Sequence, residues 1–114
     1  MLYTIYMELY EKSCIQNEGS SAKPIFIDEA NLLLPQIPGW TIDSYSGKLI
    51  KEYTFNYFSE AMTFVQKIAQ LAEAEGHHPD IRIAFTKVRL ELTTRSVCGL
   101  SENDFILASK INRL

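Results

Sequence analysis

The 114-residue chain has little of what marks several common classes of protein. Its two cysteines, Cys14 and Cys98, are too few and too far apart for a disulfide framework, so we expect reduced thiols in a cytoplasmic protein. No lysine- or arginine-rich run occurs and the formal net charge is −3, which disfavours direct binding to nucleic acid. No apolar stretch approaches the roughly 20 residues that cross a bilayer, so no contact with a membrane is expected. Glu8 and Glu11 near the start also argue against a secretory signal.

Histidine is also scarce, and its two copies are neighbours in the segment EGHHPDI, residues 75–81. Adjacent side chains point in different directions, so His77 and His78 are either a coincidence of loop composition or opposite walls of one site. No Cys-x-x-Cys or His-x-x-x-His spacing accompanies them, and we expect no metal. Two interpretations remain. The histidines are solvated side chains that suit the C-terminal end of a helix, or they exchange protons with a ligand near neutral pH.

The rest of the chain predicts one small domain over residues 28–114, preceded by a partly irregular N-terminal extension over residues 1–27. Its composition, 46% hydrophobic and 22% charged, is typical of a compact globular domain. Residues 1–10 fit either a short helix or a strand, and residues 10–25 contain turn formers without periodicity, which indicates a loop.

The clearest helix is predicted over residues 57–75, where apolar residues recur at helical spacing and Gly76 follows as a stop. The predicted buried face consists of Phe58, Ala61, Met62, Val65, Ile68, Ala69 and Ala72. A second apolar row, formed by Tyr57, Phe64 and Leu71, lies on another face. Because a small domain does not easily bury both faces of a helix, the second row is either a contact between copies of the chain or a set of scattered surface residues.

Two shorter helices are predicted on either side of this one. The first spans about Asp28–Leu34 and ends at Pro35. The second begins at Ser101, where Ser101 and Asp104 form the S-x-x-D capping pattern. Its predicted buried stripe consists of Leu107, Ile111 and Leu114.

Four strands complete the predicted domain. Residues 40–45 and 48–55 flank a turn at Ser46-Gly47, and two alternating segments starting at Ile81 and Val88 flank a turn near Thr86-Lys87. The order α-β-β-α-β-β-α predicts an α+β fold, in which helices pack on one face of a four-stranded antiparallel sheet.

A wider pattern surrounds the histidines. The acid Glu73 precedes His-His-Pro-Asp at residues 77–80, a hairpin follows, and Gly-Leu-Ser-x-x-Asp stands at residues 99–104. Pro-Gly-Trp occupies residues 38–40. Over residues 28–114 the chain resembles the pterin-4a-carbinolamine dehydratase family, in which these elements recur in the same order.

The resemblance implies a fold, a reaction and a set of partners. Family members dehydrate 4a-hydroxytetrahydropterin to quinonoid dihydropterin, which recycles the tetrahydropterin of aromatic amino acid hydroxylases. They need no metal or other cofactor. The implied fold is a four-stranded antiparallel sheet with helices on one face. Members commonly form homodimers or homotetramers, so the expected partners are a reduced pterin, further copies of the chain and an aromatic amino acid hydroxylase.

The resemblance also implies which residues form the site. His77 and His78 are expected to exchange protons with the pterin. Glu73 is expected to orient an imidazole or to bind the amino edge of the ring, and the alternative is an exposed acid on a helix. The residues expected to bind the substrate are Pro79, Thr94, Arg95, Ser96, Val97 and Asp104, although the capping role of Asp104 would explain that residue by itself.

Arg95 departs from the family pattern, which usually has a third histidine at this position. An arginine cannot act as a base, because its pKa is above 12, but it can donate hydrogen bonds to a pterin oxygen. The alternative for Arg95 is an exposed basic residue on the polar face of a strand. The departure also keeps a second function open, that of a non-catalytic coactivator or assembly protein on the same fold, because some relatives have such roles.

Overall fold

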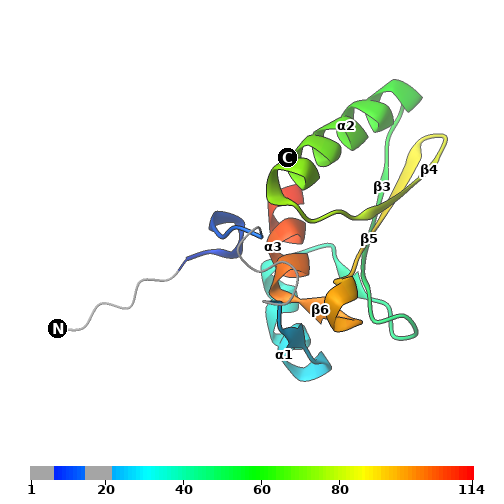
Figure 1. Ribbon diagram of the computed structural model, residues 1–114. Coiled ribbons are helices and arrows are strands. Elements are labelled where there is room, and N and C mark those ends of the chain that lie inside the picture. Colours follow the sequence, from blue (N-terminus) through cyan, green and yellow to red (C-terminus); the bar gives the residue numbers. More distant parts are fainter. Residues whose placement is uncertain (1–6, 15–21) are drawn as a thin grey trace.

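The computed structural model of the chain describes residues 7–14 and 22–114 (Figure 1). The expectations for residues 1–6 and 15–21 lie outside the described residues. Within the described part, residues 9–11 form a 3-10 turn, η1 (Leu9–Glu11), where a short helix or strand had been predicted together with the start of a loop. No helix of this part is long and apolar enough to cross a membrane.

The predicted antiparallel sheet is confirmed. Four strands, β2 (Thr41–Ile42), β3 (Leu49–Thr54), β4 (Asp80–Ala84) and β5 (Lys87–Leu92), lie in the order β2-β3-β5-β4, and every neighbouring pair is antiparallel. β2, β3 and β4 are shorter than predicted, β2 above all, whereas β5 has the predicted length and begins one residue earlier. The turn of the second hairpin lies at residues 85–86, one residue earlier than predicted, and Phe85 adopts a positive φ of 56° there.

A second, two-stranded sheet was not predicted. In it β1 (Pro24–Ile25) pairs with β6 (Leu100–Ser101). Two-residue strands are too short to show the alternation that marks a strand in a sequence. This pairing joins the end of the N-terminal extension to the segment that leads into the last helix.

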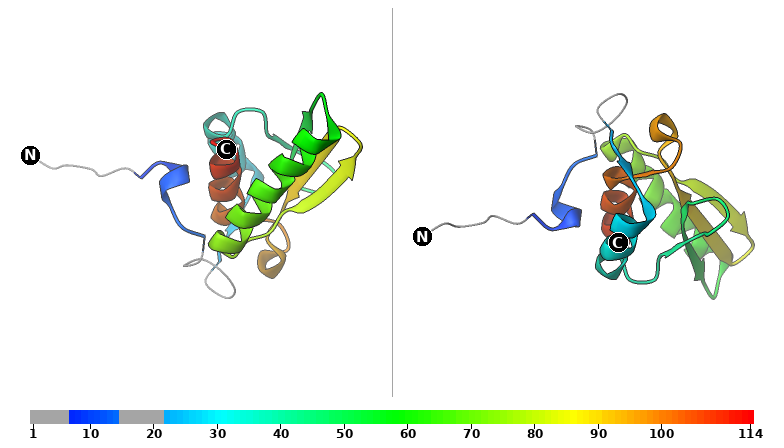
Figure 2. Two further views of the ribbon diagram at one scale, coloured as in Figure 1. Left: turned by 90° about the horizontal axis from the view of Figure 1, so that it is seen from above. Right: turned by 90° about the horizontal axis from the view of Figure 1, so that it is seen from below.

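Three α-helices lie on one face of the four-stranded sheet, as predicted (Figures 1 and 2): α1 (Ile27–Leu33), α2 (Phe58–Glu75) and α3 (Glu102–Ile111). Helix α1 ends at Leu33, one residue earlier than predicted and just before Pro35. The chain continues into the 3-10 turn η4 (Leu34–Gln36), because proline at the start of a helical turn needs no backbone N–H there. Leu114 is 50% exposed and does not extend the buried stripe of α3, because it lies beyond the end of that helix.

The prediction for the faces of α2 was partly wrong. Phe58 and Ala69, assigned to the buried face, are exposed. Phe64 and Leu71, assigned to the second row, pack against the core, and the Phe64 ring lies 4.5 Å from that of Tyr53 on β3. The buried stripe therefore runs between the two predicted rows, because the direction in which α2 crosses the sheet selects the face that is covered. This packing excludes an intermolecular contact along the whole second row.

The N-terminal segment packs against α3, which lies between that segment and the layer of α2 and the sheet (Figure 2). Leu9 and Cys14 are buried, Lys12 forms an ion pair with Glu102, and Arg113 stacks on the ring of Tyr10. Almost every side chain of α3 is buried as a result. Residues 7–14 and 22–27 thus contribute to the packing of the domain predicted for residues 28–114.

Candidate active site

The two histidines follow directly on the end of α2. Gly76 ends this helix in the left-handed conformation, at φ 67°, and the carbonyl of Ala72 accepts the backbone N–H groups of Gly76 and His77. Glycine adopts this conformation without the steric cost that a Cβ brings. The turn separates the two imidazoles. His77 is 6% exposed, whereas the side chain of His78 is 57% exposed.

His77 is held by a buried carboxylate. Its Nε2 lies 2.7 Å from Oδ1 of Asp104, which is fully buried in the first turn of α3. The other oxygen of Asp104 accepts the hydroxyl of Thr94 at 2.8 Å and the backbone N–H of Ser101 at 2.9 Å. Since an ionised carboxylate only accepts hydrogen bonds, the proton of this pair lies on Nε2 of His77. The cap of α3 therefore also sets the tautomer of the imidazole.

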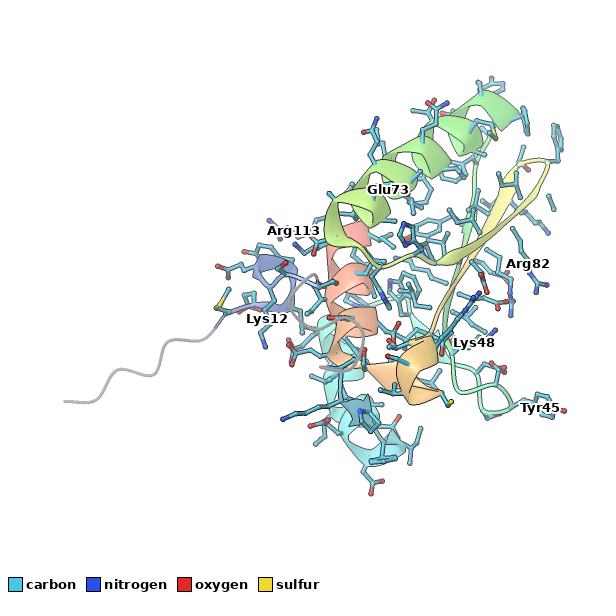
Figure 3. All side chains as sticks on the ribbon, in the orientation of Figure 1. Lys12, Tyr45, Lys48, Glu73, Arg82 and Arg113 are labelled. Carbon is cyan, nitrogen blue, oxygen red and sulfur yellow. The ribbon has the colours of Figure 1, made fainter. Side chains whose placement is uncertain are left out.

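The second histidine has a weaker partner. Nε2 of His78 lies 3.1 Å from Oε1 of Glu73, and both side chains are mostly exposed. Figure 3 shows Glu73 on the part of α2 that leads into the histidine loop. An exposed pair of this kind contributes little to stability. The His78 ring can therefore turn towards a ligand and exchange protons with solvent.

A neighbouring ion pair anchors the same end of α2. The carboxylate of Glu75 accepts the backbone N–H of Cys14 at 2.9 Å and bonds Nζ of Lys110 at 2.9 Å. Burial by itself would raise the pKa of Glu75, but these hydrogen bonds outweigh burial and lower it. The N-terminal segment and α3 are thus both attached to the residue that immediately precedes Gly76.

A cleft of about 410 Å³ opens between two walls at this point. One wall is the loop after α2, and the other is the end of β5 with the first residues of the 3-10 turn η5 (Arg95–Val97). The lining residues are Gly76, His77, His78, Pro79, Asp80, Thr93, Thr94, Arg95 and Ser96. The volume lies within the range of small-molecule sites in proteins.

Most of the site residues expected from the sequence meet here. Pro79, Thr94, Arg95 and Ser96 line the cleft with both histidines, and Glu73 reaches it through His78. Val97 lies in η5 but does not line the cleft, and Asp104 lies beneath it, behind His77.

Two residues that the sequence did not mark as part of the site, Thr93 and Ser101, also contribute to it. Thr93 lines the cleft, and the hydroxyl of Ser101 lies 2.7 Å from that of Thr94. The S-x-x-D pattern could have indicated Ser101. A residue that caps α3 together with Asp104 also contacts the hydrogen-bond partners of Asp104. Among the described residues, no group of three or more histidine, cysteine or acidic side chains could hold a metal ion.

Comparison with known proteins bears on this site. The model of the pterin 4 alpha carbinolamine dehydratase family matches residues 24–114, which include both walls of the cleft. The chain belongs to this family. A member from Methylococcus capsulatus, named provisionally as such a dehydratase, is 41% identical over 106 residues, which cover 93% of this chain and 92% of the relative. The mitochondrial pterin-4-alpha-carbinolamine dehydratase 2 of Arabidopsis thaliana is 36% identical over 110 residues, covering 94% of this chain and 59% of the plant protein.

Two solved structures agree with the fold. The crystal structure of a transcriptional coactivator/pterin dehydratase from Brucella melitensis superimposes with a TM-score of 0.76 at 30% identity, covering 80% of this chain and 97% of that one. A pterin dehydratase-like protein identified as a RuBisCO assembly factor in the alpha-carboxysome superimposes with a TM-score of 0.57 at 24% identity, covering 66% and 87%. The second likeness is one of fold alone.

Proposed function

We propose that this chain dehydrates 4a-hydroxytetrahydropterin to quinonoid dihydropterin by histidine acid–base catalysis, as a step in the recycling of tetrahydropterin. The observation that carries the proposal is the cleft, in which an imidazole held by a buried carboxylate and a second, exposed imidazole line one wall. Family membership supplies the class of substrate.

The reaction needs one proton donor and one proton acceptor. The 4a-hydroxyl leaves as water once it is protonated, while the lone pair of the adjacent ring nitrogen forms a double bond to the 4a carbon. That nitrogen then loses its own proton. One proton enters and one leaves, so nothing is oxidised or reduced, and two imidazoles near neutrality suffice. The proposal accordingly includes no cofactor.

The two histidines differ in a way that suggests their roles. Nε2 of His77 bonds Asp104, which holds the ring in one orientation, and Nδ1 would be the ring atom that accepts the proton. His78 is exposed and bonded only weakly to Glu73, so it can collect a proton from solvent and deliver it to the hydroxyl. We assign His77 as the acceptor and His78 as the donor. Asp104 acts through His77 and is a positioning residue.

The proposal extends to the binding of the ring and to partners. Pro79, Thr94, Arg95 and Ser96 would contact the pterin, with the backbone of Val97 behind them. A homodimer or homotetramer is supported by β4, which is an edge strand, and by the exposed Phe85 at its end. A cytoplasmic location and an aromatic amino acid hydroxylase as recipient of the recycled pterin belong to the same proposal.

The test is an assay with synthetic 4a-hydroxytetrahydropterin. His77→Ala and His78→Ala should each lower the rate by about 10²-fold or more, because positioned acids and bases contribute factors of this order. Tyr45→Ala serves as a matched control, since Tyr45 is 98% exposed on the far turn and should leave the rate unchanged. A parent protein no faster than the uncatalysed reaction would contradict the proposal.

Arg95 favours a second candidate, a non-catalytic binding or assembly protein. It stands where the family usually has a third histidine, and the Brucella melitensis structure, at 30% identity, is described as a transcriptional coactivator/pterin dehydratase. Arg95→His separates the candidates in the same assay. A gain in rate would mean that a weak catalyst lacks one imidazole, whereas no rate in either protein favours the binding role.

A further inference from the structure

We propose that Arg95 makes the cleft selective for pterins whose side chain carries an anionic group, a phosphate or a carboxylate. The inference rests on the proposed function and concerns which member of the substrate class the cleft takes. It depends on the charges that line the cleft and on which of them already have partners.

Arg95 is a cation without a partner among the described residues. Its exposed side chain lines the cleft, and no carboxylate of the described chain lies within ion-pairing distance. Arg89 shows the contrast, because its guanidinium bonds Glu52 at 2.7 Å and Glu91 at 2.9 Å. Nothing in the packing of the described domain therefore accounts for the position of Arg95.

The acids around the cleft leave Arg95 available to a ligand. Asp104 is engaged by His77 and Glu73 by His78. Asp80, the remaining acid that lines the cleft, lies at the start of β4 and also lacks a side-chain partner among the described residues. The residues that line the cleft thus include one available carboxylate and one available guanidinium.

These two charges complement different parts of a substituted pterin. The amino group and the neighbouring ring N–H form a donor edge, which suits the carboxylate of Asp80. A neutral ring has no negative group for the guanidinium, whereas a phosphate or carboxylate accepts two parallel N–H bonds from it. The hydroxyl of Ser96, next in the chain, can add a further hydrogen bond to such an anion.

The test compares the binding of three stable pterins that share one ring: 6-hydroxymethylpterin, its phosphate ester and 6-carboxypterin. Affinity is measured by calorimetry at low and high salt. The parent should bind both anionic pterins at least about tenfold more tightly than the neutral one, as expected for charge-assisted bonds, and salt should reduce the preference. Arg95→Gln should abolish the preference. Arg95→Lys should keep part of it, because lysine carries the positive charge but lacks the planar pair of N–H donors of a guanidinium.

Arg82→Gln is the matched control. Arg82 is an exposed arginine of β4 that does not line the cleft, and Figure 3 shows its side chain on the side of the sheet away from the helices. This variant should keep the full preference. Equal binding of all three pterins by the parent would overturn the inference and leave the proposed function standing. An equal loss of affinity for all three pterins in Arg95→Gln would have the same consequence, because it would mean that the guanidinium contacts a ring oxygen. If the parent binds no pterin, including the neutral one, both the inference and the proposed function fail.

Discussion

Replacing Asp104 by asparagine tests whether the cap of α3 controls the chemistry of His77. The carboxylate accepts three hydrogen bonds, from Thr94, from the backbone of Ser101 and from His77. In Asp104→Asn one oxygen becomes an NH₂ group, which donates. If the amide oxygen stays with Thr94 and Ser101, the NH₂ faces Nε2 of His77, and the imidazole must move its proton to Nδ1. The ring then keeps its place but loses the lone pair proposed to act as the base.

The expected magnitudes follow from these contacts. A hydrogen bond to a charged group contributes about 1.5–3 kcal/mol and a neutral one about 0.5–1.5 kcal/mol, so the free energy of unfolding should fall by about 1–2 kcal/mol in Asp104→Asn. Asp104→Ala should lose about 3–5 kcal/mol, because it also removes the helix cap and leaves buried donors without partners. The rate should fall by about 10²-fold in Asp104→Asn, since the base is then in the wrong tautomer.

Three measurements decide the outcome: urea unfolding, ¹⁵N NMR of the His77 ring and the pterin assay. Ser101→Ala is the control, because it removes the N-cap hydroxyl of α3 from the same cluster without altering the bond between Asp104 and His77. It should lower stability by about 1 kcal/mol while keeping the tautomer and the rate. An Asp104→Asn protein with Nε2 still protonated and an unchanged rate would refute the positioning role.

Three further predictions concern the surroundings of the site. The hydroxyl of Tyr53 is buried without a hydrogen-bond partner in the described structure, and burial raises its pKa to about 12. The free energy of unfolding should therefore fall as pH rises from about 10 towards 12. Thermal melts of Tyr53→Phe should show no such loss. The lowered pKa of Glu75 means that its contribution is present above its unfolded pKa near 4.5 and is lost as pH falls through the folded value, so Glu75→Gln should flatten the acid side of the stability profile. Gly76→Ala should lower the free energy of unfolding by about 1–2 kcal/mol, because a Cβ is strained at φ 67°, and should also lower the rate by displacing the histidines.

Each of these changes has a counterpart away from the site. Tyr45→Phe alters an exposed phenol and should leave the alkaline loss intact. Glu29→Gln alters an exposed acid of α1 and should leave the acid slope unchanged. Gly47→Ala carries the same backbone strain at φ 72° in open space, and should lower stability as much as the change at position 76 without lowering the rate. A rate loss of equal size in both glycine variants would show that strain alone is responsible.

Much of the fold could be predicted from the sequence, because the signals for its main elements are local. Helix α2 could be predicted from its 3.6-residue hydrophobic period and the glycine at its end, and α3 could be predicted from its S-x-x-D cap. Each of these signals lies within a short segment of the sequence. The pair of Glu73 and His78 was foreseeable for the same reason, since it spans five residues. The faces of α2 and the short pairing of β1 with β6 were missed, because both depend on how distant segments approach one another.

The sequence alone predicted the three α-helices and the four strands of the main sheet in their order, and showed that two histidines follow a helix end beside an acid. The partner of His77, in contrast, depends on the tertiary structure. The bond between His77 and Asp104 joins residues 27 apart, and it exists because packing brings the first turn of α3 beneath the loop after α2. The same packing brings Arg95 and Asp80 to the lining of one cleft. Hydrogen bonds and charges act over a few ångströms in space, and separation along the chain says nothing about that distance until the core has formed.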